Sequence, residues 1–122
     1  MERAWTYVVL TLLGTVAGQL LLKFAMGRHG EIPEGLSAAA GFIGRALLDP
    51  LVLLSLTLAF GAALAWIAAV SKLSLGTAYP FMSLAFVITA LFSVLLLGES
   101  ISPMRWAGIG VVVVGLVLVA RG

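Results

Sequence analysis

The sequence predicts an all-α membrane protein with four transmembrane helices. Four long stretches contain no Asp, Glu, Lys, Arg or His, and 62% of the 122 residues are hydrophobic. A bilayer core of about 30 Å is spanned by about 20 mostly apolar residues in a helix. Three stretches have this length, and the fourth reaches it if Pro103 begins the helix and Arg105 extends to the headgroups. The four stretches are 4–22, 50–71, 73–98 and 106–120.

Residues typical of helix starts and ends set the bounds of the expected spans. Gly27 and Gly98 suit the ends of helices, and Pro50 and Pro103 suit first helical turns. The link between the second and third spans is short, so we expect these two helices to be antiparallel neighbours. We therefore expect one domain, residues 1–122, with spans at about 4–26, 50–71, 75–98 and 103–121.

The composition excludes several classes of function. The chain has no Cys, which excludes disulfides, thiolate metal sites and Cys nucleophiles. The single His, His29, has no clustered carboxylates around it, so we expect a solvated loop residue, no metal site and no cofactor. The formal net charge of +2 comes from scattered basic residues, which argues against nucleic-acid binding. We expect a membrane protein that is not an enzyme.

The connection between the first two spans, residues 28–49, is the longest. Its second half combines large apolar residues with small ones. Two interpretations fit this pattern equally: a short helix lying along the membrane interface, or an N-terminal extension of the second span. In the first, Arg45 and Asp49 reach water. The large apolar residues are Leu36, Phe42, Ile43, Leu47 and Leu48.

The basic residues do not decide the orientation in the membrane. With both termini in the cytoplasm, Arg3, Lys72 and Arg121 lie on the cytoplasmic side, and the positive-inside rule gives no bias. This balance fits dual topology, in which two copies insert in opposite directions, or an orientation set by a partner or the translocon. The opposite side then holds Lys23, Arg28, Arg45 and Arg105.

Polar residues one helical turn apart follow the first span: Thr11, Thr15, Gln19 and Lys23. This spacing places neighbours in contact on one face, which must meet protein, water or a substrate because hydrocarbon offers no hydrogen-bond partner. Lys23 lies about 27 Å along the helix from Trp5. It is either a lysine that anchors the helix end in the headgroups or a cation that receives an anionic group such as phosphate. Gln19 lies deeper, as an interhelical clamp or a ligand contact.

Two pairs of glycines predict close helix packing. Gly14 and Gly18 form a G-x-x-x-G pair in the first span, and Gly108 and Gly115 lie two turns apart in the fourth. Both pairs fit either a dimer contact or packing inside one subunit. A face of small residues in the second span supports close contact there too: Gly61, Ala62, Ala65, Ala68 and Ala69.

The third span begins with Tyr79, Pro80 and Ser83 close together. If Pro80 lies inside the helix, it removes a hydrogen bond to the Gly76 carbonyl and kinks the chain, with Tyr79 and Ser83 on the same wall. Alternatively, Pro80 lies in the first turn and Tyr79 anchors the helix at the interface. Glu99 is expected to be a solvated turn residue that helps to cap the fourth helix.

Three groups of residues resemble a known family. They are Val16-Ala17-Gly18-Gln19-Leu20 with Lys23, Ala78-Tyr79-Pro80 with Ser83-Leu84, and Ser102-Pro103 with Arg105-Trp106 and Gly108. The chain is similar to the small flippase subunits for undecaprenyl-phosphate aminoarabinose, which are EamA-like members of the drug/metabolite transporter superfamily. The resemblance covers nearly the whole chain except residues 28–49. It implies a four-helix protein of the bacterial inner membrane that moves a lipid-linked sugar to the periplasmic leaflet.

One departure separates this chain from the related small multidrug resistance exporters. Those exporters carry a Glu in the first helix that exchanges protons for drug, and the matching position here is Thr15, which cannot ionise. No predicted span contains another carboxylate. The resemblance therefore favours a flippase over an exporter of cationic or small polar solutes. A counterpart of the family's third-helix Tyr is present as Tyr79.

Four helices are too few to enclose a path with alternating access, so we expect a homodimer or a heterodimer with a related four-helix subunit. The hypothesis is translocation of a polyprenyl-phosphate-linked monosaccharide, with a groove lined by the first three spans. Lys23 meets the phosphate, Gln19 and Tyr79 meet the polar head, and Thr15 and Ser83 line the wall. The alternatives are a small-solute exporter and a non-transporting accessory subunit of a larger enzyme.

Overall fold

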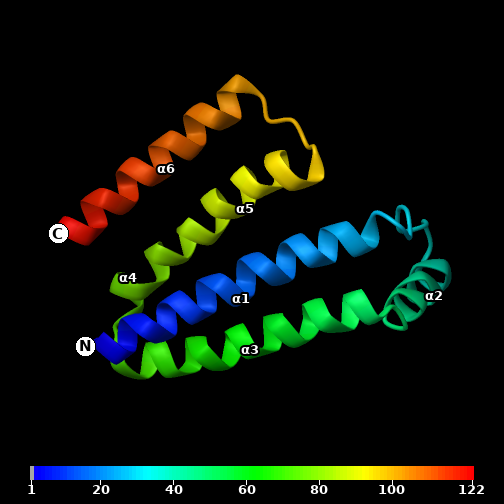
Figure 1. Cartoon of the computed structure of the whole chain (residues 1–122), viewed down its shortest axis with the longest axis horizontal. Coiled ribbons are helices and arrows are strands. Elements are labelled where there is room, and N and C mark those ends of the chain that lie inside the picture. The colour runs from blue at the N-terminus through cyan, green and yellow to red at the C-terminus, as the bar shows by residue number, and fades with distance from the viewer. Residues whose placement is uncertain (1) are drawn as a thin grey trace.

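The computed structural model describes residues 2–122, with the backbone alone at Glu2. Within residues 2–122, four helices are long and apolar enough to cross a membrane, at Arg3–Met26, Pro50–Lys72, Leu75–Leu97 and Pro103–Arg121. Each bound lies within one residue of its expected position. In Figure 1, α1 lies between α3 and α5, and α6 follows α5 on the outer side. The elements are α1 (Glu2–Met26), α2 (Leu36–Ala46), α3 (Pro50–Lys72), α4 (Leu75–Ala78), the 3-10 helix η1 (Tyr79–Met82), α5 (Ser83–Leu97) and α6 (Pro103–Arg121).

The closest helix packing in the molecule is between α1 and α3. A Cβ on Gly14 would lie 3.0 Å from the Cβ of Ala62, and a Cβ on Gly18 would lie 3.2 Å from the Ser55 carbonyl oxygen. Such distances are reached because glycine has no side chain to hold the two backbones apart. The G-x-x-x-G pair of α1 therefore packs inside one subunit, against Ser55, Leu58, Ala59 and Ala62 of α3; of the expected small-residue face, only Ala62 is among these residues.

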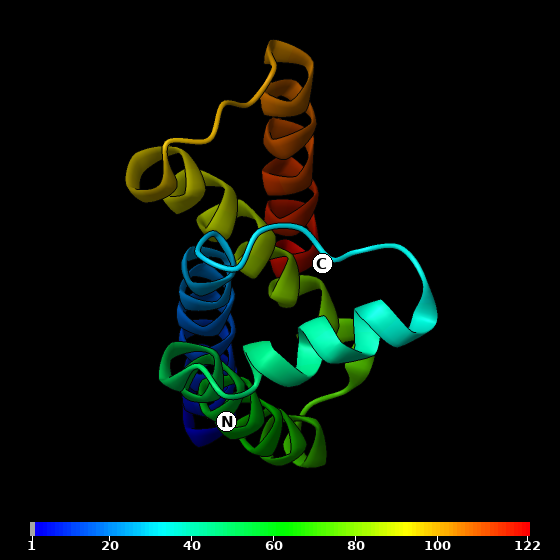
Figure 2. The ribbon, with the colours of Figure 1, turned by 90° about the vertical axis from the view of Figure 1, so that its right-hand side faces the viewer.

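The connection between α1 and α3 contains a separate helix, α2, that crosses the ends of the spans (Figure 2). Phe42 and Ala46 of α2 are buried, whereas Leu36 is 90% exposed. The alternative that these residues extend the second span is wrong. Asp49, the residue before Pro50, adopts an extended backbone conformation and ends the preceding helical stretch. This arrangement fits a short helix at the membrane interface.

Asp49 ties the connection to the start of α3. One carboxylate oxygen accepts hydrogen bonds from Arg28 at 2.6 Å and lies 2.8 Å from the His29 Nε2. The other accepts from the Leu51 backbone N–H at 2.9 Å, which caps α3. The expectation that Asp49 reaches water is therefore wrong, since its side chain is only 9% exposed. His29 is an exposed loop residue, as expected, and it also contacts Asp49. The contacts of Asp49 with Arg28 and His29 connect the end of α1 to the start of α3.

The third span is interrupted near its beginning by Pro80. One helical turn, α4, is followed by the 3-10 turn η1, and α5 then continues the span. The span begins at Leu75, so Pro80 lies inside it. Because proline has no N–H to bond to the Gly76 carbonyl, the regular α-helix is interrupted at this position. The alternative that places Pro80 in the first turn of the span is wrong. Gly98 ends α5 in the left-handed conformation, at a φ of 71°.

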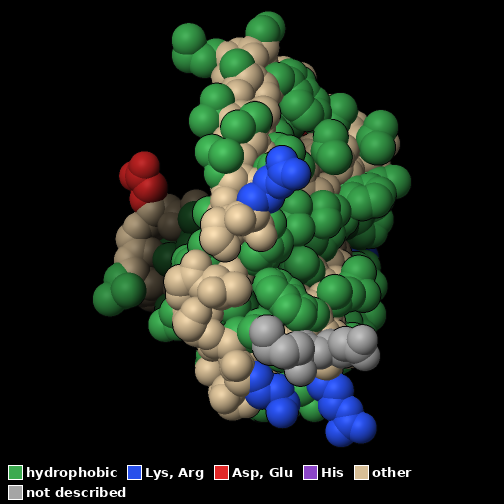
Figure 3. Space-filling view, turned by 90° about the vertical axis from the view of Figure 1, so that its left-hand side faces the viewer, with side chains coloured by type: hydrophobic (Ala, Val, Ile, Leu, Met, Phe, Trp, Pro, Cys, Tyr) green, Lys and Arg blue, Asp and Glu red, His purple; other side chains and the backbone are tan. Residues whose placement is uncertain are grey.

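The two termini lie at the same end of the molecule (Figure 1), as four membrane crossings require. Figure 3 looks onto this end and shows Lys and Arg side chains at the edge of a largely hydrophobic surface. Packing within the chain weakens toward the C-terminus. The most apolar 18 residues of the first span are 28% buried, and those of the fourth are 11% buried. Helix α6 therefore presents most of its surface to lipid or to another protein.

A candidate substrate path along α1

The polar line of α1 opens onto two pockets. The first has a volume of about 490 Å³ and lies between α1, α3 and the segment around η1. The second has a volume of about 840 Å³ and lies between α1, α5 and α6. Thr11 and Thr15 line the first pocket, Lys23 lines the second, and Gln19 lines both. The polar face of α1 is thus not sealed by neighbouring helices.

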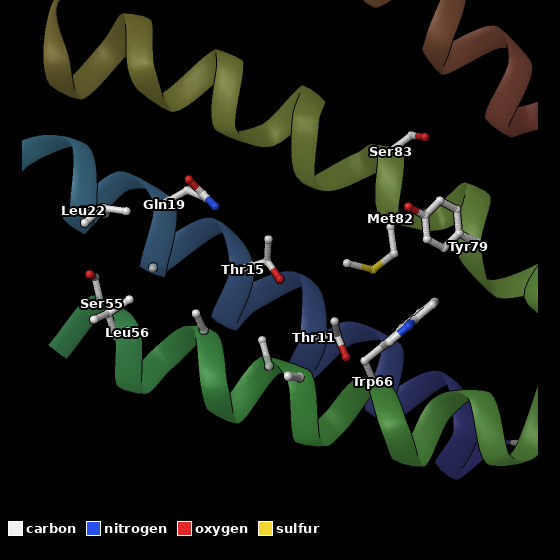
Figure 4. A pocket seen from close by; sticks show the side chains of 14 residues that line it. Thr11, Thr15, Gln19, Leu22, Ser55, Leu56, Trp66, Tyr79, Met82 and Ser83 are labelled. Atoms are coloured by element: carbon white, nitrogen blue, oxygen red, sulfur yellow. The ribbon is translucent and has the colours of Figure 1, made fainter. Parts of the chain in front are cut away.

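The first pocket combines hydroxyl groups, one amide and aromatic rings. In Figure 4, Thr15 and Gln19 extend from α1 toward α5, and Met82 points from η1 toward Thr15. Trp66 and Tyr79 pack edge to face across one end, with ring centroids 6.1 Å apart. No Asp, Glu, Lys, Arg or His is among the described residues that line this pocket. Its chemistry suits a neutral polar group such as a sugar.

Only some of these polar groups are available to a ligand. The Thr11 hydroxyl donates to the Tyr7 carbonyl at 2.8 Å, and the Ser55 hydroxyl donates to the Val52 carbonyl at 2.7 Å. The side chains of Thr15, Gln19 and Ser83 make no hydrogen bond within residues 2–122. Because hydrocarbon cannot satisfy these groups, they are the ones left to bind a ligand or water.

The second pocket differs from the first in carrying charge. Lys23 of α1, Glu99 of the α5–α6 connection and Arg105 of α6 all line it. The Lys23 Nζ lies 3.7 Å from the Glu99 Oε2, and the two side chains are 66% and 42% exposed. The cap of α6 is supplied instead by Ser102, whose hydroxyl oxygen accepts from the Arg105 backbone N–H. The expectation that Glu99 helps to cap this helix is therefore wrong.

The structure divides the expected site residues between the two pockets. Thr15, Tyr79 and Ser83 share the first with Gln19, as the spacing around Pro80 predicted for Tyr79 and Ser83. Lys23 lies in the second, apart from Tyr79. Instead of one groove lined by the first three spans, the polar line of α1 borders the two pockets described above, and the fourth span lines the second.

The expected glycine contacts separate in the same way. Gly14 and Gly18 belong to the α1–α3 contact, and Gly18 also lines the first pocket. Gly108 lines the second pocket, and nothing within residues 2–122 comes within 4 Å of a Cβ built on Gly108 or Gly115.

Several lining residues were not predicted as site residues. Trp66 and Met82 line the first pocket, and Arg105, which we expected at the headgroups, lines the second. A signal for Trp66 was present, since an indole near the end of an apolar span suits a boundary between polar and apolar surroundings. Met82 carries no such signal, because a Met in an apolar span is ordinary core composition.

Comparison with known proteins decides the family. Residues 2–121 match the model of the EamA-like transporter family. This chain belongs to that family. The chain is therefore a multi-pass membrane protein of a transporter family, and its four apolar helices agree with this.

Relatives within the EamA-like family match this chain over nearly its full length. A protein of Shigella flexneri serotype 5b is 30% identical over 93% of this chain and 94% of its own, and one of Pseudomonas savastanoi pv. phaseolicola is 28% identical over 96% of each. A protein of Escherichia coli strain 55989 is 29% identical over 93% and 94%. Each is named as a probable 4-amino-4-deoxy-L-arabinose-phosphoundecaprenol flippase subunit, ArnE. No solved structure matches the chain.

Proposed function

We propose that this EamA-like chain is a flippase subunit, not an enzyme, that moves a polyprenyl-phosphate-linked monosaccharide across the bacterial inner membrane. The observation that carries the proposal is the course of the polar line of α1, from an uncharged aromatic pocket to a pocket with two basic groups. The relatives named as flippase subunits for such a lipid match over nearly the whole chain, which supports the same substrate class. The assignment to the bacterial inner membrane also rests on the similarity to these relatives.

In this proposal each pocket receives one part of the substrate. The monosaccharide contacts Thr15, Tyr79 and Ser83 in the first pocket, where hydroxyl groups and aromatic edges replace its water shell. The phosphate contacts Lys23 in the second pocket, and Gln19 at the junction contacts either part. The polyprenyl tail remains in lipid, because most of the α1 surface beside the two pockets is unburied and apolar.

A second four-helix subunit completes the path. Alternating access is usually built from two related halves, and one copy of this chain supplies half. The weak packing of α6 and the open glycines Gly108 and Gly115 favour this helix as the contact with the other subunit. The partner is a second copy of this chain or a related chain, since the relatives are named as subunits.

Replacement of Lys23 tests the phosphate contact. Lys23→Gln removes a charge-assisted interaction, for which we expect about a tenfold loss in the rate of lipid-linked sugar delivery to the outer leaflet. The rate is measured in vesicles with a fluorescent or radiolabelled lipid and an impermeant reagent that reaches only the outer leaflet. Lys72→Gln is the matched control, because Lys72 ends α3 at the opposite side of the molecule.

Unchanged delivery by Lys23→Gln at equal protein level would remove Lys23 from this role. The same vesicles distinguish the exporter alternative, which requires a proton-coupled carrier group. Thr15 occupies the position of the carboxylate used by the small multidrug resistance exporters, so we expect no drug-dependent proton movement.

A further inference from the structure

The second pocket contains an acid as well as two bases. Lys23 Nζ lies 3.7 Å from Glu99 Oε2, while Arg105 makes no ion pair within residues 2–122. Glu99 is the one carboxylate, and no His is present, among the described residues that line this pocket. The formal charges of the three side chains therefore sum to +1.

Each of the three charged residues lies at a helix end that borders the pocket. Lys23 lies in the last turn of α1. Glu99 follows the left-handed Gly98, and its N–H bonds to the Ser93 carbonyl at 3.2 Å, so the turn directs the chain back across the pocket. Arg105 lies in the first turn of α6, where its N–H bonds to the Ser102 hydroxyl at 3.3 Å. The backbone of Glu99 is thus positioned by the end of α5.

An anionic ligand must compete with Glu99 for Lys23. An ion pair between exposed side chains is weak, so a phosphate can displace the carboxylate at little cost. The carboxylate nevertheless stays beside the ligand and repels additional negative charge. A phosphodiester carries one negative charge, whereas a phosphomonoester carries about 1.5 to 2 at pH 7.

We propose that Glu99 is a specificity determinant that selects a lipid phosphodiester over the corresponding phosphomonoester. With Glu99 present, the pocket charge of +1 balances a monoanion. A dianion leaves an unbalanced negative charge next to Glu99, and the like charges repel each other. A polyprenyl phosphate that carries a sugar is a diester, and the bare carrier is a monoester. Glu99 therefore favours the loaded lipid, an inference that rests on the proposed function.

The test compares two lipids on the protein reconstituted in nanodiscs, with its partner subunit if the partner is a different chain. The probes are a polyprenyl phosphodiester of a monosaccharide and polyprenyl phosphate, and the measurement is the ratio of their dissociation constants at pH 7.5. The natural chain is expected to prefer the diester. Glu99→Gln raises the pocket charge to +2 and is expected to lower this preference about fivefold, as loss of about 1 kcal/mol of repulsion implies.

Two further arms separate charge selection from a structural effect. At pH 5 the monoester is below its second pKa near 6, so it carries about one charge and the preference of the natural chain should disappear. Glu99→Asp keeps the charge and is expected to keep most of the preference. Glu31→Gln removes one carboxylate from the α1–α2 connection, outside the pocket, and is the matched control, expected to change nothing.

The outcomes distinguish this inference from the proposed function. A natural chain that binds neither lipid contradicts the proposed function itself. Binding of both lipids, with a ratio that Glu99→Gln leaves unchanged, overturns only the role of Glu99. If Glu99→Gln fails to fold, a preference of the natural chain that persists at pH 5 overturns the inference. Displacement of the lipid by inorganic phosphate at equal concentration would identify a free anion as the occupant instead.

Discussion

The two glycine pairs, Gly14 and Gly18 in the α1–α3 contact and Gly108 and Gly115 in α6, have opposite surroundings. At Gly14 and Gly18, α3 approaches so closely that a Cβ would lie 3.0 to 3.2 Å from its atoms, so the neighbouring helix would have to shift slightly. No atom of residues 2–122 outside the helix's own backbone lies within 4 Å of a Cβ built on Gly108, which borders the second pocket, or on Gly115. The first pair is explained by packing within one subunit. The second is left without a partner in the single chain.

This difference shows what a glycine pattern can and cannot predict. Small residues at a spacing of four or seven indicate that another backbone approaches, but they do not identify the chain to which that backbone belongs. The remaining surface supplies the distinction. Helix α3 is tied to α1 by the Asp49 cluster and by the close approach at Gly14 and Gly18. Helix α6 packs chiefly against α5 and η1 and keeps exposed apolar residues such as Val111 and Leu118.

The largest expected contrast is in cross-linking. The chain has no Cys, so a single cysteine at Gly115 can carry a maleimide–benzophenone probe. Illumination of native membranes is expected to convert much of the Gly115→Cys protein to a two-subunit product, because α6 faces the partner. Phe60→Cys is the control, since Phe60 is 66% exposed but lies on α3. Mass spectrometry of the product identifies the partner as the same chain or a related one.

A product from Phe60→Cys but not from Gly115→Cys would place the subunit contact on α3. Cross-links only to lipid from both positions would argue for a monomer.

The next contrast is in stability. Gly14→Val forces two methyl groups into the contact with Ala62 and is expected to destabilise the fold by about 1–3 kcal/mol, the usual cost of overpacking. Gly115→Val meets open space within the subunit and is the matched control, with a change near zero in the isolated chain. Unfolding in mixed detergent micelles measures both. Equal destabilisation by the two variants would contradict the distinction between a closed and an open glycine pair.

The sequence predicted the four spans well because charge-free length is a direct requirement of the bilayer. Their bounds followed from Pro50, Pro103 and Gly98, each of which leaves few backbone alternatives. The sequence left two positions open for Pro80, inside the span or in its first turn. The start of the span at Leu75 places Pro80 inside, and the missing N–H explains the break there. Local backbone chemistry thus accounts for most of the fold.

Contacts between distant residues were not predictable in the same way. Nothing in the periodicity of α1 places Lys23 near Glu99, which is far away in sequence and belongs to a turn between two other helices. The Asp49 cluster is similar, because a loop His and an Asp before a Pro fit solvated residues equally well. The polar line of α1 was predictable, but its division between two pockets depends on how α5 tilts away from α3, which no local pattern encodes.

The smallest expected contrast concerns the loop end of the α1–α3 pair. The hydrogen bond with His29, followed by that from the Leu51 N–H, lowers the pKa of Asp49 below its ordinary value of 3.8. The ionised carboxylate therefore stabilises the fold at every pH above that value, and this contribution is lost as the pH falls through the lowered pKa.

Asp49→Asn keeps a capping side chain but removes the charge, so its effect isolates the contacts with Arg28 and His29. We expect a fall in the unfolding temperature smaller than that of Gly14→Val, present at pH 7 and shrinking below pH 3.8. Glu34→Gln, which removes an exposed carboxylate from the same connection, is the control. If Asp49→Asn were as stable as the natural chain at pH 7, the cluster would be a consequence of α1–α3 packing and not a cause of it.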